Sequence, residues 1–404
     1  MMKRETIPEL SVVMPCLNEA DTLATCISKA LSTIKENGLD AEVIVADNGS
    51  TDGSQEIARE CGAVVVSVST PGYGAALKGG IAAARGRFII MGDADDSYDF
   101  NELMSFVTAL RNGAELVMGC RLPAGGGVVS TGAMPWSHRW IGNPGFTFLA
   151  RRLFKMPNHD VYCGLRGFTR ELYDDLQLRC LGMEFATEMI IKASLFERRI
   201  DEVPITLHPD GRRSHPPHLN TLADGLRTLR FYLLYSPRWL FTVPGTMLLL
   251  LGLLSFAAIL PSPVSVGGFA RLDVHTLLVA GVASIVGLQL VIFGLFTTLF
   301  AMAEGLVPIR QPLYSRISEI APKVGFWAGS AAVVIGLTIL GVTTMSWVVA
   351  GFPDLVYEIT MRRVLPAVTL VALGTQAVFG GIFLGLLDLH RQSQSLELDP
   401  PASQ

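Results

Sequence analysis

Two aspartates, Asp93 and Asp95, follow directly after the short apolar run 87–91. The run is rich in isoleucine, begins after a glycine and is too short for a helix, so it predicts a buried strand. In open α/β sheets, ligands bind at the carboxyl ends of the strands. Two carboxylates one residue apart can share a hard cation, and Mg²⁺ or Mn²⁺ takes further ligands from water and phosphate oxygens. The pair therefore predicts a metal–diphosphate site, whereas a lone Asp-x-Asp without supporting motifs is more often a polar turn.

The first half of the chain alternates between strand-like and helix-like patterns. Short apolar runs separate stretches in which apolar residues recur at helical spacing. This alternation predicts a doubly wound, mostly parallel α/β sheet. The expected strands are 10–15, 42–46, 63–68, 87–91 and 115–118, and the expected helices are 23–34, 75–85, 100–110 and one that starts near Gln55.

Polar residues or glycines follow each of the first four expected strands. Carboxylates and amides at the first two exits can hydrogen-bond a base or ribose, and glycines at the third let the next helix N-terminus approach phosphate. Each group alone is ordinary turn chemistry, but four consecutive exits of this kind indicate a nucleotide site. No Gly-x-Gly-x-x-Gly follows the first strand, which disfavours a nicotinamide or flavin enzyme. The groups are Asn18 and Glu19, then Asp47, Asn48 and Asp52, then Gly72 and Gly74, and finally Asp93 and Asp95.

The ordered series of these motifs resembles glycosyltransferase family 2, with the dolichyl- or polyprenyl-phosphate mannose and glucose synthases as the nearest subgroup. The resemblance covers roughly residues 10–235 and lies in the order of the motifs rather than in any one of them. It implies a GT-A fold, a nucleotide-sugar donor, a divalent metal and inversion at the anomeric carbon. The residues that carry it are Pro15, Asn18, Glu19, Asp47–Asp52, Gly72–Gly79 and Asp93-Ala94-Asp95.

The resemblance also implies roles for individual residues. Asp93 and Asp95 would be the metal ligands, and Asp96-Ser97 replaces the family's frequent Leu-Gln, so the motif names no third ligand. Nucleotide-sugar binding falls to Pro15, Asn18, Glu19, Asp47, Asn48, Asp52, Gly74, Lys78 and Asp93. Asp160, Arg121 and Asp95 are the expected catalytic residues, with Asp160 in a segment that approaches the reacting sugar. Because guanidinium groups match phosphate oxygens, Arg139, Arg212 and Arg213 are the candidates for holding an acceptor phosphate.

Basic residues also accompany two amphipathic stripes. Residues 146–154 carry an apolar stripe with Arg151 and Arg152 on the other face, and 219–233 carry a leucine stripe with Arg227 and Arg230 off it. This pattern is typical of helices that lie in a membrane surface. A helix packed on the domain with a solvated basic face is the alternative.

The second half of the chain is almost free of charge. Charged residues make up 17% of the whole chain, against about 25% in soluble domains, and the shortage begins near residue 240. Four uncharged runs, 240–260, 276–303, 324–351 and 364–387, each exceed the roughly 18 residues that mark a transmembrane helix. The basic loop between the second and third runs places the catalytic part and the C-terminus in the cytoplasm, although Arg362 and Arg363 weaken that count. We therefore expect a multi-pass protein of the cell (inner) membrane.

These patterns predict four parts. A GT-A domain should cover residues 1–218, an amphipathic juxtamembrane helix 219–239, a four-helix transmembrane domain 240–390 and a disordered cytoplasmic tail 391–404. The net charge of −4 gives no sign of nucleic-acid binding. The six cysteines lack metal-ligand spacing and are expected to be small buried residues. A homo-oligomer is left open.

The function that we expect is transfer of a hexose from a nucleotide-diphosphate sugar to a membrane polyprenyl phosphate. A polysaccharide or glycolipid synthase that acts on a sugar hydroxyl is the main alternative. Processive synthases carry Gln-x-x-Arg-Trp near the membrane, and Arg139-Trp140 keeps only the second half of that motif. A catalytically dead membrane scaffold is a third possibility, against which the intact Asp93 and Asp95 argue.

Overall fold

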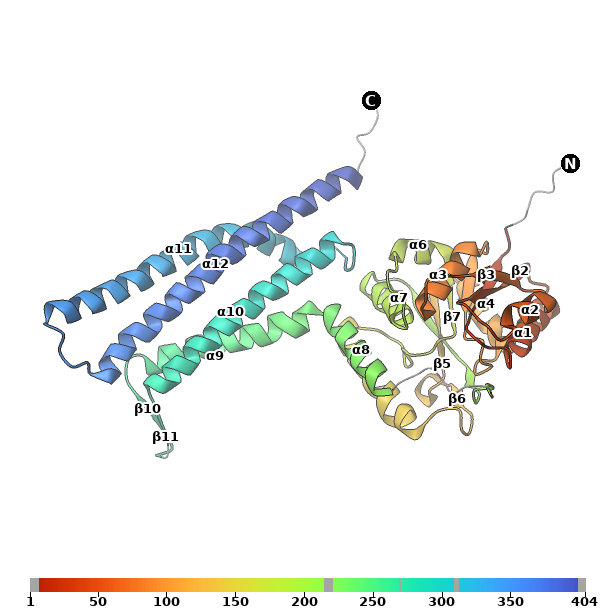
Figure 1. The fold of residues 1–404 in the computed structure, drawn as a ribbon, viewed down its shortest axis with the longest axis horizontal. Coiled ribbons are helices and arrows are strands. Elements are labelled where there is room, and N and C mark those ends of the chain that lie inside the picture. The colour runs from red at the N-terminus through yellow and green to blue at the C-terminus, as the bar shows by residue number, and fades with distance from the viewer. Residues whose placement is uncertain (1–6, 214–220, 269, 309–311, 399–404) are drawn as a thin grey trace, which may run out of the picture. The chain divides into compact units, whose positions relative to one another are not determined.

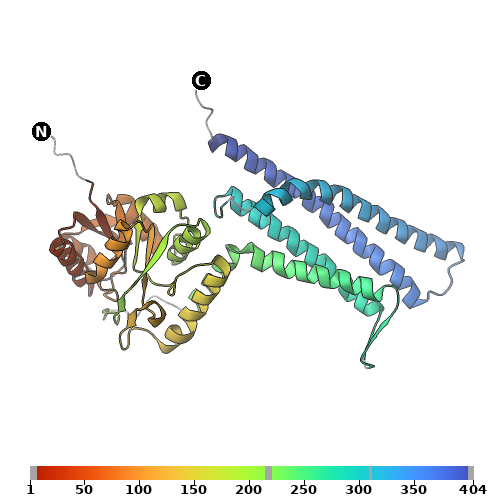
Figure 2. The ribbon, with the colours of Figure 1, turned by 180° about the vertical axis from the view of Figure 1, so that it is seen from behind.

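The computed structural model describes residues 7–213, 221–268, 270–308 and 312–398. The chain divides into two compact units, the first ending at Tyr232 and the second beginning at Leu233. Figure 1 labels their elements, and Figure 2 shows them from behind. Each unit is described separately below.

The described part of the first unit is built on a seven-stranded sheet in the order β3-β2-β1-β4-β7-β5-β8. Six strands are parallel, and β7 is antiparallel to both β4 and β5. The mostly parallel sheet that the sequence predicts is thus confirmed, as is the GT-A-like fold class. The strands are β1 (Leu10–Cys16), β2 (Ala41–Asp47), β3 (Val64–Ser67), β4 (Phe88–Met91), β5 (Leu116–Cys120), β7 (Arg166–Thr169) and β8 (Ile200–Pro204).

Helices cover both faces of this sheet, as Figures 1 and 2 show. Successive residues of a strand point to opposite faces, so β1 buries Val12 in the core shared with α1 and α4, and turns Val13 toward Gly80 of α3. Burial on both faces explains why the inner strands read as continuous apolar runs. The helices are α1 (Leu23–Glu36), α2 (Ser54–Glu60), α3 (Tyr73–Ala83), α4 (Leu103–Arg111), α6 (Arg170–Leu176) and α7 (Glu184–Leu195).

A small second sheet fixes the loop that follows β9. The short strands β6 (Val128–Val129) and β9 (Thr206–Leu207) pair in parallel. Beyond β9, the amide of His208 donates to the carbonyl of Ser97 over 2.9 Å, and the amide of Gly211 donates to the carbonyl of Asp95 over 2.9 Å. The 208–213 segment is therefore held against the loop that leaves β4.

The basic segments form helices of the first unit. They are the π-helical turn His138–Gly142, α5 (Asn143–Phe154) and α8 (Thr221–Leu234). Tyr232 of α8 is fully buried between Phe146 and Phe154 of α5, with ring centroids 6.2 and 5.6 Å away. This aromatic contact extends the first unit beyond the boundary predicted at residue 218.

The second unit contains, within its described residues, four helices long and apolar enough to cross a membrane. Together with the short hairpin β10 (Val264–Val266) and β11 (Ala270–Leu272), they confirm the predicted four-helix transmembrane domain. Glycines let neighbouring helices approach closely: a Cβ at Gly287 would lie 2.3 Å from the backbone nitrogen of Leu249. The helices are α9 (Val243–Ile259), which continues the π-helical turn Arg238–Thr242, α10 (Val274–Ala303), α11 (Pro312–Val349) and α12 (Tyr357–Leu398).

The last helix is longer than predicted. The sequence suggests a disordered tail from residue 391, but α12 continues to Leu398. No proline or glycine occurs between residues 388 and 398, so nothing in the sequence interrupts the backbone hydrogen bonds of a helix there. Residues 399–404 of the predicted tail lie outside the described residues.

Candidate active site

The polar loops predicted at the strand ends meet at the carboxyl edge of the sheet. In register, Cys16 of β1 lies opposite Asp47 of β2, and Val13 of β1 lies opposite Met91 of β4. Because these strands are parallel, the residues that follow them leave the sheet on the same side. Asp93 and Asp95 are thereby brought to the loop after β1.

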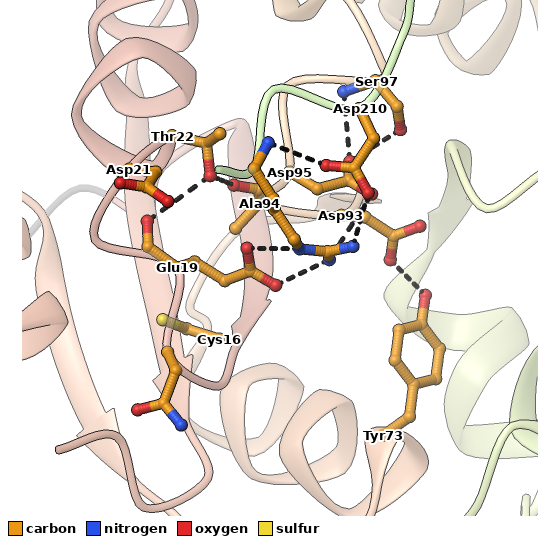
Figure 3. A network of polar contacts seen from close by, with 12 residues as sticks. Cys16, Glu19, Asp21, Thr22, Tyr73, Asp93, Ala94, Asp95, Ser97 and Asp210 are labelled. Carbon is orange, nitrogen blue, oxygen red and sulfur yellow. Dashed lines mark hydrogen bonds and ion pairs between the residues drawn. The ribbon is translucent and has the colours of Figure 1, made fainter. Parts of the chain in front are cut away.

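Asp93 is partly buried and is hydrogen-bonded from a neighbouring helix. The hydroxyl of Tyr73 donates a hydrogen bond of 2.8 Å to Asp93 Oδ1, as Figure 3 shows. Burial and the neighbouring charge of Asp95 together raise the pKa of Asp93 to about 7, against the lowering effect of the Tyr73 hydrogen bond. A partly buried carboxylate beside a second one is a position where a bound cation is stabilising.

Asp95 is one of three carboxylates that lie close to the side chain of Arg212, and Figure 3 labels all three. Arg212 donates from Nε and Nη2 to both carboxylate oxygens of Glu19, over 2.7 and 2.6 Å. Its Nη1 donates to Asp210 over 2.8 Å, and its Nη2 lies 3.5 Å from Asp95 Oδ2. Burial would lower the pKa of Arg212, but its hydrogen bonds to Glu19 and the charge of Asp95 hold that pKa above its usual range. Glu19 and Arg212 therefore share one cluster with the two aspartates, although the sequence placed Arg212 on an acceptor phosphate.

The remaining polar residues after β1 and β2 tie the two loops together. Asn18 Oδ1 accepts from the amide of Thr51 over 2.9 Å, and Asp52 Oδ2 accepts from the amide of Ala20 over 2.9 Å. Asp47 is buried and accepts hydrogen bonds from the amides of Gly49 and Ser50 and from the side chain of Gln55. Asn48 donates to the carbonyls of Val68 and Thr70. Pro15 is buried within β1 opposite Ala46. The predicted nucleotide residues of these two loops are thus gathered in one place, where they set the loop conformation.

Gly74 and Lys78 lie on α3 beside the segment 176–182. A Cβ at Gly74 would come within 2.7 Å of Phe185 Cβ and 2.8 Å of the Gly182 carbonyl oxygen, so the contact requires glycine. Lys78 Nζ donates to the carbonyl of Leu178 over 2.9 Å. The structure therefore uses both residues to pack this segment on α3.

The two other predicted catalytic residues are paired with each other. Arg121 donates from Nε and Nη2 to Asp160 Oδ2 and Oδ1 over 2.7 and 2.9 Å, and its amide also donates to Oδ2 over 3.1 Å. Both residues are buried. Burial alone would raise the pKa of Asp160, but the charge and hydrogen bonds of Arg121 outweigh it and hold that pKa below its usual range. Asp160 is thus an ionised carboxylate whose oxygens are already engaged.

A pocket of about 640 Å³ lies beside this ion pair, between the segment after Arg121 and helix α5. The cationic side chains in its lining are Arg139, Arg151 and Arg152, and its aromatic ones are Trp140, Phe148 and His159. Arg139 Nε and Thr147 Oγ1 are buried and, among the described residues, have no hydrogen-bond partner. The structure therefore places Arg139 in this pocket and Arg212 in the acidic cluster, while the Arg213 side chain is exposed and its amide donates to Asp21.

The acidic cluster suits a divalent cation only in part. Among the described residues, no three His, Cys, Asp or Glu side chains are arranged to hold a metal by themselves. Asp93 and Asp95 supply two hard oxygen ligands, and Mg²⁺ typically needs no more than one or two carboxylates when a substrate phosphate completes its coordination. The residues therefore fit a metal that arrives with a diphosphate.

Sequence reasoning missed two members of the cluster. Tyr73 stands between the glycines that drew attention to its motif, and Asp210 belongs to a segment valued for its arginines. Both contacts join segments far apart in the sequence, and only the tyrosine in the glycine motif offered a local signal.

Comparisons with known proteins match this architecture. The glycosyl transferase family 2 model matches residues 11–177, and the model of that family's C-terminal transmembrane region matches residues 295–388. The low-salt glycan biosynthesis hexosyltransferase Agl6 of Haloferax volcanii is 37% identical over 94% of this chain and 89% of its own. The dolichyl-phosphate hexose transferase of the same organism is 30% identical over 55% of this chain and 92% of its own.

Among solved structures, glucosyl-3-phosphoglycerate synthase from Mycobacterium tuberculosis covers 56% of this chain and 79% of its own, with 24% identity and a TM-score of 0.44. The family assignment rests on the sequence matches instead, which extend over the catalytic and the transmembrane parts. The chain belongs to glycosyltransferase family 2 and is a membrane-bound glycosyltransferase of that family.

Proposed function

We propose that this protein transfers a hexose from a nucleotide-diphosphate sugar to a polyprenyl phosphate in the membrane. The pocket at Arg139 is the observation that carries the proposal. It combines cationic side chains with aromatic ones, and two of its buried polar atoms have no partner among the described residues. An anion with an apolar tail is the ligand that such a lining favours.

The surface around the pocket supports a lipid ligand. Trp136, Trp140, Ile141 and Phe148 are all more than half exposed. Exposed aromatic and apolar side chains beside arginines are typical of an element that lies in the membrane interface. A prenyl phosphate has its headgroup at that depth and its chain in the hydrocarbon.

The route from the pocket to the donor site is short. Leu122 and His159, which line the pocket, are the chain neighbours of Arg121 and Asp160. Gly164, four residues after Asp160, lies against the donor site, since a Cβ there would be 2.9 Å from Asp93 Oδ2. Short chain segments therefore connect the buried Arg121–Asp160 pair to both the basic pocket and the predicted metal ligands.

The chemistry of a phosphate acceptor fits these groups. A lipid phosphate is already an anionic nucleophile, whereas a sugar hydroxyl needs a general base. Asp160, the carboxylate expected beside the reacting sugar, is committed to Arg121 and has a lowered pKa. A divalent metal held by Asp93 and Asp95 would neutralise the charge of the leaving nucleotide diphosphate. Arg139 would then hold the acceptor phosphate, and Arg121 would orient the segment between the two sites.

The proposal can be tested by measuring sugar transfer by the purified full-length protein from a panel of radiolabelled nucleotide sugars to three acceptors. Polyprenyl phosphate should be glycosylated, while polyprenol and a free sugar should not. Replacing Arg139→Gln should lower kcat/KM for polyprenyl phosphate by about 10-fold or more, because one charge-assisted hydrogen bond is lost, and should leave nucleotide-sugar affinity unchanged. The exposed Arg59 provides a matched control, and Arg59→Gln should behave as wild type. Preference for the free sugar would overturn the acceptor assignment.

A further inference from the structure

Each of the two predicted metal ligands is held by a hydrogen-bond donor from outside the pair. Ser97 donates to Asp95 Oδ1 from its hydroxyl over 2.6 Å and from its amide over 3.1 Å. Tyr73 donates to Asp93 Oδ1 over 2.8 Å. Figure 3 shows the Tyr73 hydroxyl pointing at Asp93. The two donors differ in origin, because Ser97 belongs to the same loop as Asp95, whereas Tyr73 comes from a different helix.

The position of Tyr73 is fixed by the segment that packs on the start of α3. The amide of Ala75 donates to the carbonyl of Leu181 over 2.9 Å. Gly72 has φ of +134° and lies so close to Leu181 that a Cβ there would come within 2.3 Å of its carbonyl oxygen. The first turn of α3 therefore has little freedom to move relative to this segment.

A buried ion pair anchors the same segment. Glu188 and Lys192 of α7 are fully buried and lie 3.1 Å apart. Glu188 Oε2 accepts from the amides of Arg179 and Cys180 over 2.9 and 2.8 Å, while Lys192 Nζ donates to the carbonyl of Leu176 over 2.9 Å. The polar groups of both side chains thus hydrogen-bond to the segment 176–182, which in turn contacts the start of α3.

We infer that Tyr73 is a positioning residue: its hydroxyl holds the carboxylate of Asp93 in the orientation that binds the divalent metal. The inference rests on the metal site of the proposed function. A carboxylate on a flexible side chain can rotate, and a donor on one oxygen leaves the other oxygen in a defined direction. Partners that orient metal ligands in this way typically contribute 10- to 100-fold to metal affinity. Tyr73 is set in place by α3 and α7, so its hydroxyl meets Asp93 without the chain having to reorganise.

The protein contains a matched control for the loss of this hydroxyl. Tyr98 is buried and close to Asp93, but its hydroxyl accepts from the amide of Gly164 over 2.8 Å and, within the described part of the chain, makes no hydrogen bond to the carboxylate. Tyr73→Phe and Tyr98→Phe therefore remove the same atom from two rings close to Asp93, one partly buried and one buried. A purely structural role predicts equal effects on metal binding, whereas a positioning role predicts a loss in the first variant alone.

The test is titration of the full-length protein in detergent with Mn²⁺ in the presence of UDP or GDP, with free Mn²⁺ measured by electron paramagnetic resonance and compared with a protein-free titration. Tyr73→Phe should bind Mn²⁺ at least about 10-fold more weakly than wild type, and Tyr98→Phe should stay within about 2-fold of wild type although its unbonded Gly164 amide lowers the thermal midpoint. Thermal melts establish that both variants are folded. Equal Mn²⁺ affinity of Tyr73→Phe and wild type would overturn this inference and leave the proposed metal site standing. Wild-type protein that binds no Mn²⁺ in the presence of either UDP or GDP would overturn both.

Discussion

At the scale of single residues, several of the predicted site residues form ion pairs with one another. Arg121 and Asp160 form a buried bidentate pair, and Arg212 is bound by Glu19 and Asp210. The motifs named these residues, but not their partners, because a motif lists residue types along one segment while each pair joins segments that are distant in the sequence. The sequence thus indicated which residues gather at the site, and the fold decides what each one contacts.

The Arg121–Asp160 pair gives the first prediction. Asp160→Asn leaves the buried Arg121 charge without its counterion and should lower the free energy of unfolding of the catalytic unit by about 3 kcal/mol at pH 7. Because the folded-state pKa of Asp160 is lowered, its contribution is present above its unfolded pKa of about 4 and is lost as the pH falls through the folded value. Chemical denaturation followed by tryptophan fluorescence should therefore show a gap between the two proteins that narrows only below about pH 4.

The half-exposed Asp175, which pairs with Arg198 at the surface, provides the control. Asp175→Asn should change stability by no more than about 0.5 kcal/mol. Identical denaturation midpoints for Asp160→Asn and wild type at pH 7 would mean that the buried pair contributes no net stability.

Adjacent arginines in the 208–213 segment give the second prediction. Arg212 is largely buried and pairs with three carboxylates, whereas the side chain of Arg213 is exposed. Arg212→Gln should cost about 3 kcal/mol of stability, because Glu19, Asp95 and Asp210 lose their shared cation, and Arg213→Gln should cost less than about 0.5 kcal/mol. Denaturation of the two variants side by side measures the difference, and equal midpoints would refute the assignment of Arg212 to the acidic cluster.

At the scale of elements, the sequence predicted five of the seven strands of the main sheet and missed β7 and β8, which are not continuous apolar runs. The runs 10–15, 42–46 and 87–91 lie within or next to β1, β2 and β4. β7 begins at Arg166, a fully buried arginine in the middle of the sheet, whose guanidinium donates to the carbonyls of Cys163, Val161 and Ala186. A strand that opens on a charged residue gives no apolar pattern, because its burial depends on carbonyls supplied by the surrounding fold.

The contact between α7 and the segment 176–182 gives an element-scale prediction. Lys192→Met removes the donor to the Leu176 carbonyl and leaves Glu188 as an uncompensated buried charge, which should cost about 3 kcal/mol. Hydrogen–deuterium exchange should rise in 176–182 and at the start of α3, since both lose the same anchor. Arg59→Met, which breaks an exposed pair with Glu56, should leave exchange in both segments unchanged. Protection equal to wild type in Lys192→Met would show that the ion pair does not anchor this segment.

At the scale of the whole molecule, the first unit contains the candidate active site and the second contains the helices long and apolar enough to cross a membrane. The second unit also gives a structural reason for an arginine that the topology argument counted as adverse. Arg362 of α12 donates to the carbonyl of Leu260 over 2.9 Å and pairs with Asp273, which caps α10. It thereby links the end of α9 to the starts of α10 and α12, so its place at this end of the helices follows from packing.

The last prediction concerns the orientation in the membrane. The basic loop between the second and third spans and the four spans found among the described residues predict that the catalytic unit and the C-terminus lie in the cytoplasm. The hairpin that contains Ser265 joins the first and second spans, so it should face the outside. A membrane-impermeant maleimide added to intact cells should label Ser265→Cys and should not label Ser315→Cys until the cells are opened. All six native cysteines lie between residues 16 and 180, so wild-type protein should stay unlabelled in intact cells. Labelling of wild type and of Ser315→Cys from outside, with protection of Ser265→Cys, would establish the opposite orientation and would place the nucleotide-sugar site on the wrong side of the membrane for a cytoplasmic donor.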